Sequence, residues 1–346
     1  MGLSTSLEGL NERERKVLEA IVQSYVETAE PVGSRVLSRQ FGLGVSAATI
    51  RNAMSDLEEK GYLYHPHTSA GRVPTDRAYR LYVDTLMGTP KLTREERELL
   101  REGLSHDSAV PEILRRAAEV LGVLAQELGV AVAPSLDDTV LERLDLVAVT
   151  SERLLLVLSL RSGVVRTIFV QVPGSLHQDA IVHITLVLND RLAGLTLREI
   201  RQTLAERLRD TGVTPAENEL LDIFLATGEQ LFDLPPEGEG VVLGHTSVLA
   251  DQPEFAGGRM RSLIELTEQR DVLRRVLGKR SAAGSLTITI GGENEPALAN
   301  LTLVTSPYRA GPLTGVIGVL GPTRMPYEKV VALVEHTSKM VSDLLR

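Results

Sequence analysis

The stretch SAATIRNAMSDLEEKGYLYHPHTSAGRVP, residues 46–74, decides the fold of the first part of this chain. Its first half predicts a helix that begins at Ser46, a preferred N-cap residue, and ends at Gly61, a preferred helix stop. Apolar residues at helical spacing predict one buried side of this helix, formed by Ile50, Ala53, Met54 and Leu57. The second half predicts a strand at 62–64, a turn-rich loop and a return strand at 73–74, which together form a hairpin.

The other side of this predicted helix carries small and hydrogen-bonding side chains, and no acid precedes Asp56. Small residues let a helix enter a DNA major groove, which is about 12 Å wide, while Arg51 and Asn52 can each form paired hydrogen bonds with base edges. The start of the helix is suited to contact phosphate, and Arg72 in the hairpin is suited to contact phosphate or the minor groove. The candidate DNA-binding residues are therefore Ser46, Ala47, Thr49, Arg51, Asn52, Ser55, His67 and Arg72.

Two further helices are predicted before this stretch. The first begins at Asn11, which forms a capping-box pattern with Glu14, and it ends before Pro31 because the residue preceding a proline avoids the helical region. The second occupies residues 33–42 and ends at a glycine. Three helices followed by a hairpin with a basic tip predict a winged helix-turn-helix. The same elements could form a protein-interaction module, but the acid-free side of the third helix favours DNA.

The charge of the chain is unevenly distributed, which matters because a net charge of −9 is unusual for a DNA-binding protein. Residues 1–89 contain 10 Lys and Arg and 11 Asp and Glu, a net charge of −1, so the remainder carries −8. Two stretches of the first part, 31–55 and 61–75, contain basic residues and no acid. A basic surface of this size predicts modest non-specific affinity for DNA, with specificity that comes from dimeric binding.

The composition excludes or disfavours several classes of site. The chain has no Cys, which rules out disulfides, thiolate nucleophiles and cysteine-ligated zinc. No P-loop, G-x-S-x-G or H-E-x-x-H motif is present, so we expect no enzyme activity and no cofactor. His65 and His67 could bind a metal ion, but their place in the hairpin loop favours contact with solvent or phosphate. The run 291–294 is interpreted as a turn in which Glu293 or Asn294 bonds to the backbone.

The apolar stretches of the chain are too short to cross a membrane, which takes about 18–20 residues. The longest, 154–160, is interrupted by Ser159 and is typical of a buried strand. The first residues, MGLSTSLEGLNERER, lack the positive start and apolar core of a secretory signal. We therefore expect a cytoplasmic protein with no membrane partner.

Beyond residue 90 the sequence alternates between sheet and helix. Strands are predicted at 140–150, 154–160, 164–172, 286–290, 301–306 and 314–320. A mostly helical segment at 179–232 separates the two groups of strands, and a final helix is predicted at 326–344. Sheet, helical segment and sheet again predict an α+β domain interrupted by an inserted subdomain.

Four stretches of the chain also resemble a known family. One is ATIRNAMSDLEEKGYLYHPHTSAGRVPTDRAYRLYVD, residues 48–84, which looks like the signature of HrcA, the heat-inducible transcription repressor family. Residues 189–201, 290–295 and 315–335 resemble further stretches in the family's order. The resemblance implies a GAF-like α+β domain that carries an inserted dimerisation subdomain. It also implies a homodimer that binds double-stranded DNA at an inverted-repeat operator called CIRCE, upstream of chaperonin and Hsp70 operons, with the GroEL chaperonin as a regulatory partner.

The predicted domains are the winged helix at 1–89, the first part of the GAF-like domain with a linker helix at 90–175, the inserted dimerisation subdomain at 176–242 and the second part of the GAF-like domain at 243–346. The predicted function is negative regulation of heat-shock operons. A metabolite-sensing regulator that uses the GAF-like domain is the alternative, although aromatic residues that could line a pocket are few, at 3%. An enzyme with an appended DNA-binding domain is disfavoured because no catalytic motif is visible.

Overall fold

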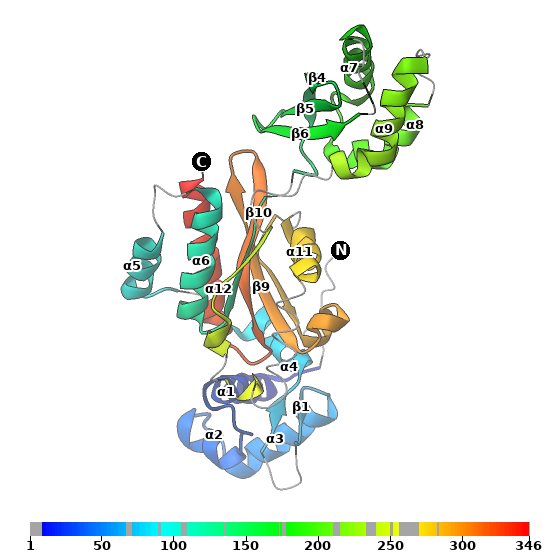
Figure 1. The fold of residues 1–346 in the computed structure, drawn as a ribbon. Coiled ribbons are helices and arrows are strands. Elements are labelled where there is room, and N and C mark those ends of the chain that lie inside the picture. The colour runs from blue at the N-terminus through cyan, green and yellow to red at the C-terminus, as the bar shows by residue number, and fades with distance from the viewer. Residues whose placement is uncertain are drawn as a thin grey trace. The chain divides into compact units, whose positions relative to one another are not determined.

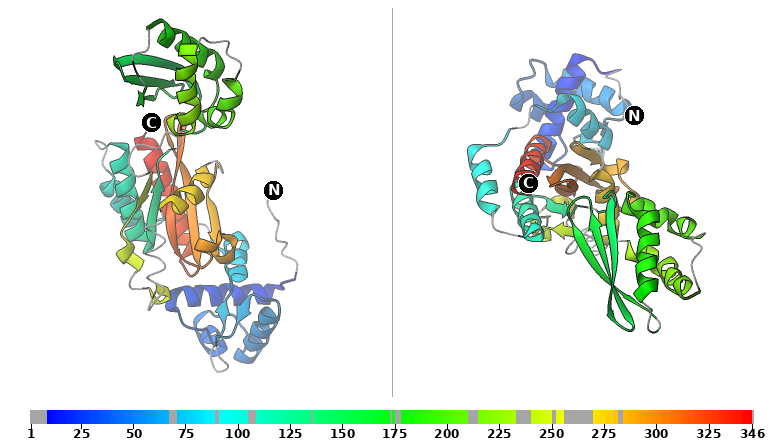
Figure 2. Two further views of the ribbon diagram at one scale, coloured as in Figure 1. Left: turned by 45° about the vertical axis from the view of Figure 1, so that its right-hand side comes forward. Right: turned by 90° about the horizontal axis from the view of Figure 1, so that it is seen from above.

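Helices and strands are mixed along the chain, and the computed structural model divides it into two units (Figures 1 and 2). One unit comprises Met1–Val132, Val241–Tyr308 and Val316–Leu345, and the other chiefly Ala133–Gly240 and Arg309–Gly315. The structure describes residues 9–66, 71–88, 91–104, 109–134, 136–172, 174, 178–209, 215–232, 240–249, 252–255, 270–281 and 284–345. No helix in these ranges is both long enough and apolar enough to span a membrane.

The first unit begins with a small group of helices and a hairpin, residues 9–66 and 71–88, which we call the N-terminal lobe (Figure 1). Its elements are α1 (Glu12–Thr28), α2 (Ser34–Gln40), α3 (Ala47–Glu59), β1 (Leu63–Tyr64), β2 (Val73–Pro74), α4 (Asp76–Leu81) and the π-helical η1 (Tyr82–Leu86). Asn11 and Glu14 form the expected reciprocal capping box at the start of α1. The predicted order of three helices and a hairpin is therefore confirmed.

One side of α3 is buried, as the spacing of its apolar residues predicts. The buried residues of the helix are Ile50, Ala53, Met54 and Leu57. The helix α3 packs against both α1 and α2. Leu18 and Ile21 of α1 and Leu37 of α2 are also fully buried. The core of the N-terminal lobe thus holds α3 by its apolar side and leaves the opposite side facing outward.

The rest of the first unit contains, within the described residues, a five-stranded sheet in the order β7-β3-β10-β9-β8. The strands are β3 (Leu128–Val132), β7 (Val241–Leu243), β8 (Thr287–Ile290), β9 (Leu301–Ala310) and β10 (Leu313–Pro322). The helices are α5 (Arg94–Gly103), α6 (Val110–Ala125), α11 (Arg270–Ser281) and α12 (Tyr327–Leu344), with short 3-10 turns at η2 (Thr246–Leu249), η3 (Pro253–Phe255), η4 (Gly291–Glu293) and η5 (Pro296–Leu298).

Helices cover both faces of this sheet (Figure 1). The helices α6 and α12 pack together on one face, and α11 lies on the other, where its Leu273 and Leu277 join an apolar cluster with strand residues. All five residues of β3 are buried, as expected for a strand that is covered on both sides. The mixed helix-and-sheet composition agrees with the predicted α+β class.

The second unit combines a three-stranded sheet with three helices. The sheet has the antiparallel order β4-β5-β6, formed by β4 (Leu141–Thr150), β5 (Arg153–Leu160) and β6 (Val165–Gln171). The helices are α7 (Gln178–Leu192), α8 (Leu197–Arg207) and α9 (Pro215–Leu231). The strands agree closely with the predicted ranges.

The boundary of this unit differs from the expected one. The sequence analysis begins the insert at residue 176 and assigns the three strands to the preceding domain, whereas the structure begins the unit at Ala133. The reason is a shared core: alternate residues of β5, among them Leu156 and Leu158, form one apolar cluster with Ile184 and Phe224 of the helices. A sheet with one face covered by helices belongs with those helices, because neither could bury its apolar side alone.

A carboxyl group is buried in the first unit next to the start of β3. Glu127 is 2% exposed, and its Oε2 accepts a hydrogen bond from Gln252 Nε2 at 3.3 Å. Gly321 leaves room for this side chain, because a Cβ there would lie 1.9 Å from Glu127 Oε2. Burial raises the pKa of Glu127 well above its usual value, although Gln252 and Arg324 act in the opposite direction. The folded protein therefore favours the protonated carboxyl.

We expect Glu127→Gln to stabilise the protein increasingly as the pH rises. Because the folded pKa is raised, stability linked to the proton is fully present below the unfolded pKa, about pH 4, and is lost as the pH rises towards the folded pKa. Glutamine keeps the shape of the side chain without ionising. Thermal unfolding of both proteins from pH 4 to pH 8 should show a widening difference in Tm, with about 2–4 °C for each 1 kcal/mol. A difference that stays constant over this range would contradict the assignment.

Candidate nucleic-acid interface

The start of α3 is held by hydroxyl groups that the sequence analysis places near phosphate. Ser46 is the N-cap, and its Oγ accepts a hydrogen bond from Thr49 N at 3.2 Å. The Oγ atom also lies 3.0 Å from Thr49 Oγ1. Ser46 is exposed, whereas Ala47 and Thr49 are half-buried. The structure thus gives Ser46 and Thr49 a capping role in addition to the phosphate contact predicted for them.

The middle of α3 presents exposed side chains with free hydrogen-bonding groups. Arg51, Asn52 and Ser55 are exposed, and they follow Ala48, which is also exposed. The structure brings these residues together on the side opposite the buried stripe. The side chains of Arg51 and Asn52 have no hydrogen bond or ion pair with any residue that the structure describes. Their groups are therefore free to bond with an external partner.

The basic residues between 31 and 80 divide into two groups. Arg35, Arg39 and Arg51 are exposed and have no ion pair within the described part of the lobe, and all three lie in the acid-free stretch 31–55. Arg35 and Arg39 are not among the site residues predicted from the sequence. Their exposure on α2 makes them further candidates for phosphate contacts, and the signal that could have identified them is the absence of neighbouring acids.

The other four basic residues bond to the lobe or its neighbours. Lys60 forms a 2.8 Å ion pair with Glu14, and Arg77 donates to Lys60 O at 2.8 Å and lies over the Tyr62 ring. Arg72 and Arg80 each form an ion pair with a glutamate. These contacts join elements of the first unit, so the charges serve the internal structure.

Arg72 lies at the loop end of the hairpin, directly before β2. Its Nη2 is 2.8 Å from Glu58 Oε2, and its side chain is 14% exposed. His65 Nδ1 lies 2.6 Å from the other oxygen of the same carboxylate. The carboxylate of Glu58 therefore connects the end of β1 and the start of β2 to the last turn of α3. A phosphate contact by Arg72 stays a prediction, and the geometry adds a positioning role for this side chain.

The hairpin is also joined to the segment between α1 and α2. Val32 N donates to Arg72 O and Arg72 N donates to Val32 O, both at 2.9 Å. Gly71 permits this approach, because a Cβ there would lie 2.4 Å from the carbonyl group of Val32. His67, which the sequence analysis assigns to DNA, lies outside the described residues. The loop end of the paired strands is thus fixed on two sides, by Glu58 and by Val32.

We predict that Arg51→Ala weakens specific DNA binding by roughly 1–3 kcal/mol, because it removes a side chain that can bond to a base edge. An electrophoretic mobility-shift titration on the inverted-repeat duplex implied by the family resemblance measures this change. The control is Arg94→Ala, since Arg94 is an exposed arginine on α5 whose partner is Glu98. Equal affinities for wild type and Arg51→Ala would count against a base contact by this residue.

Comparison with known proteins connects this interface with a family. Residues 111–331 match the family described as HrcA protein C terminal domain. The heat-inducible transcription repressor HrcA of Chlorobium phaeovibrioides is 40% identical over 351 aligned residues, which cover 97% of this chain and 98% of that protein. The heat-inducible transcription repressor HrcA of Syntrophobacter fumaroxidans is 36% identical, with 97% of each chain covered.

A solved structure shares the fold. A crystal structure described as that of a hypothetical protein is 24% identical and has a TM-score of 0.58, with 97% of this chain and 99% of that chain covered. Similarity at this level of identity supports the fold alone. The family match, by contrast, spans more than half of the chain, and the two repressors resemble it over nearly their whole length. The chain therefore belongs to the HrcA family of heat-inducible transcription repressors.

Proposed function

We propose that this chain represses heat-shock operons as a homodimer that binds the inverted-repeat operator CIRCE, with one α3 helix in each half-site. The observation that carries the proposal is the outward side of α3 in a chain of this family. There Arg51 and Asn52 are exposed and unpaired with described residues, and no acid precedes Asp56. The members of this family are transcription repressors rather than enzymes.

The N-terminal lobe acts as a winged helix-turn-helix in this proposal. Its third helix, α3, enters the major groove, and the hairpin β1–β2 is the wing. Ser46, Ala47 and Thr49 bring the start of the helix against phosphate, whereas Ser55 lies at the far end of the contact. His67 and Arg72 belong to the wing, and the ion pair between Arg72 and Glu58 supports a wing of defined position.

The second unit provides the dimer contact, and an open sheet face supports this assignment. The helices α7, α8 and α9 cover one face of the sheet β4-β5-β6. The opposite face carries Val147, Val165 and Phe169, which are 49%, 56% and 56% exposed. Leu155 of β5 lies directly between Val147 and Phe169 in the register, so these side chains form one apolar surface. A second copy of the chain would bury it by two-fold symmetry.

We predict that Phe169→Asp shifts the protein from dimer to monomer, because it places a charge on this apolar face, beside Leu155. Sedimentation velocity at micromolar concentration measures the change. The matched control is Val123→Asp, at a valine that is 56% exposed on α6 in the other unit. The dimer assignment to this face would be overturned by a Phe169→Asp protein that sediments as the wild type does.

The five-stranded sheet of the first unit is the GAF-like domain of the proposal. The chaperonin GroEL acts as a regulatory partner that keeps the repressor in its DNA-binding state. A protein of marginal stability suits this role, because one or two kcal/mol then decides the active fraction. On heat stress the chaperonin is occupied by other clients, the active fraction falls, and the operons are transcribed.

Genome-wide mapping of bound DNA, before and after a heat pulse, tests the proposed function. We expect enrichment at the promoters of chaperonin and Hsp70 operons that falls after the pulse. The control is the Arg51→Ala chain, which should lose the same peaks without a change in its cellular level. Enrichment at unrelated promoters would overturn the heat-shock assignment, and enrichment that follows an added metabolite instead of heat would favour a metabolite-sensing regulator.

A further inference from the structure

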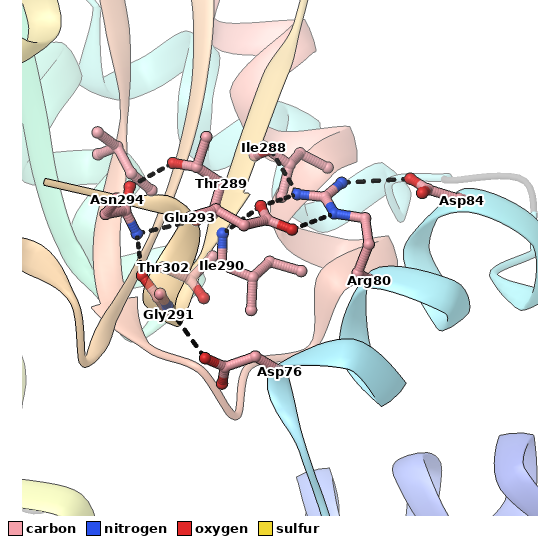
Figure 3. A network of polar contacts seen from close by, with 12 residues as sticks. Asp76, Arg80, Asp84, Ile288, Thr289, Ile290, Gly291, Glu293, Asn294 and Thr302 are labelled. Atoms are coloured by element: carbon pink, nitrogen blue, oxygen red, sulfur yellow. Dashed lines mark hydrogen bonds and ion pairs between the residues drawn. The ribbon is translucent and has the colours of Figure 1, made fainter. Parts of the chain in front are cut away.

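A network of polar contacts joins α4 of the N-terminal lobe to η4 in the remainder of the first unit, which contains the five-stranded sheet and which we call the sheet domain (Figure 3). Arg80 Nε donates to Glu293 Oε1 at 2.7 Å, and its Nη2 donates to Glu293 Oε2 and, at 2.8 Å, to Ile288 O. One turn earlier on α4, Asp76 accepts a hydrogen bond from Gly292 N at 3.0 Å. We call the contacts of Asp76 and Arg80 with residues 288–293 the α4 latch.

The partner of α4 in the latch is a turn at residues 290–294 that is held by its own hydrogen bonds. The amide group of Asn294 donates to Gly291 O at 3.2 Å and to Leu301 O at 2.7 Å, which confirms the turn that the sequence analysis expects here. Glu293 Oε2 accepts a hydrogen bond from Ile290 N at 2.9 Å. Burial would raise the pKa of Glu293, but its bonds with Arg80 and Ile290 lower it below the usual value, so the carboxylate is charged.

Gly291 allows the close approach of the two parts. Its φ is 51°, and a Cβ at this position would lie 1.9 Å from Asp76 Oδ2. The run of residues 291–293 therefore meets α4 directly, backbone against carboxylate. The sequence pattern of this run indicates only a turn. The ion pair of Glu293 with Arg80 is a further role of this residue.

The latch is connected to α3 through the first residue before α4. Thr75 caps α4, and its Oγ1 donates to Gly61 O at 2.9 Å and to Tyr62 O at 3.1 Å, directly after the end of α3. Arg77 of α4 donates to Lys60 O, the C-cap of α3. A short and continuous path of hydrogen bonds thus leads from Glu293 through α4 to the end of α3.

A second contact holds the lobe at the end of α1. Arg324, which precedes α12, donates to Val26 O near the end of α1 at 2.7 Å and forms an ion pair with Glu254. Glu328 of α12 also accepts hydrogen bonds from Tyr82 Oη at 3.1 Å and from Gly88 N at 2.9 Å. Several attachment points on different elements restrain rotation of the lobe on the sheet domain far better than a single point does. Charged side chains outside the proposed DNA-binding surface thus help to set the orientation of α3 with respect to the sheet domain, beside the buried contact between the rings of Tyr79 and Tyr327.

We propose that the α4 latch sets the orientation of α3, and thereby the distance between the two half-sites that a dimer can bind at once. Arg80 and Glu293 are positioning residues for operator recognition and do not touch DNA. This inference rests on the proposed function, since it requires a dimer on an inverted repeat. A lobe that is free to turn still binds one half-site, but the second half-site then binds at a lower effective concentration and tolerates more spacings.

The experiment compares full-length wild type with Glu293→Gln, Arg80→Glu and the exchange of both charges, Arg80→Glu with Glu293→Arg. The DNA probes are duplexes with a single CIRCE half-site, the intact inverted repeat, and inverted repeats whose spacer is lengthened by one, two or about five base pairs, the last being half a helical turn. Arg94→Ala, which removes an ion pair on α5, is the control for the loss of a surface arginine.

We expect the single variants to bind a half-site as wild type does and to bind the intact repeat about tenfold or more weakly. Their preference for the native spacer over the longer spacers should shrink, and the charge exchange should restore it. A variant that loses half-site and full-site affinity equally, or that keeps the wild-type spacer preference, would overturn the latch. If wild type itself shows no preference for the repeat over the half-site, the proposed function fails instead. Glu293→Gln, the mildest change, keeps the test valid if Arg80→Glu does not fold.

Discussion

The burial of one side of α3 is the constraint on which the proposed DNA-binding surface depends. Ile50 and Leu57 are fully buried, and full burial of such a side chain contributes about 1.5–3 kcal/mol, so rotation of the helix about its axis would expose them at a large cost. The side with Arg51 and Asn52 must then face outward. The last turn is fixed as well, because Lys60 bonds to Glu14, whose side chain is 4% exposed. Both the rotation and the end of α3 are thus set by residues that leave its outward side free.

The ion pairs of the N-terminal lobe connect its elements to one another and to the rest of the first unit. Glu14, Glu58 and Glu293 each hold a basic residue that joins two elements of the first unit. The acid-free stretch 31–55 leaves its arginines without such partners among the described residues. Exposed ion pairs contribute little to stability, but those at the junctions are partly buried and geometrically defined, so their main effect is to fix orientation. A net charge of −9 is compatible with DNA binding, because no acid precedes Asp56 in α3 and the stretch 31–55 contains none.

The sheets of the two units differ in how many of their faces are covered by helices. Helices cover both faces of the five-stranded sheet, which explains why β3 is buried throughout. The sheet β4-β5-β6 has helices on one face, and its other face carries Val147 and Phe169, which are half exposed. A free apolar face in a repressor family is the reason to look for the dimer contact there. The distinction between the sheets cannot be made from strand patterns alone, since the strands of both are rich in Leu and Val.

The sequence by itself determined the elements of the lobe, the buried and outward sides of α3, the positions of the main strands and the family. Each of these follows from local signals: helix caps, helical spacing, turns and contiguous motifs. Tertiary structure alone decided that the strands at 141–171 share a core with the helices that follow, that Arg72 bonds to Glu58, and that Arg80 bonds to Glu293. These facts depend on which distant side chains meet. Arg80 and Glu293 are 213 positions apart, and nothing in the local pattern around either residue specifies the other.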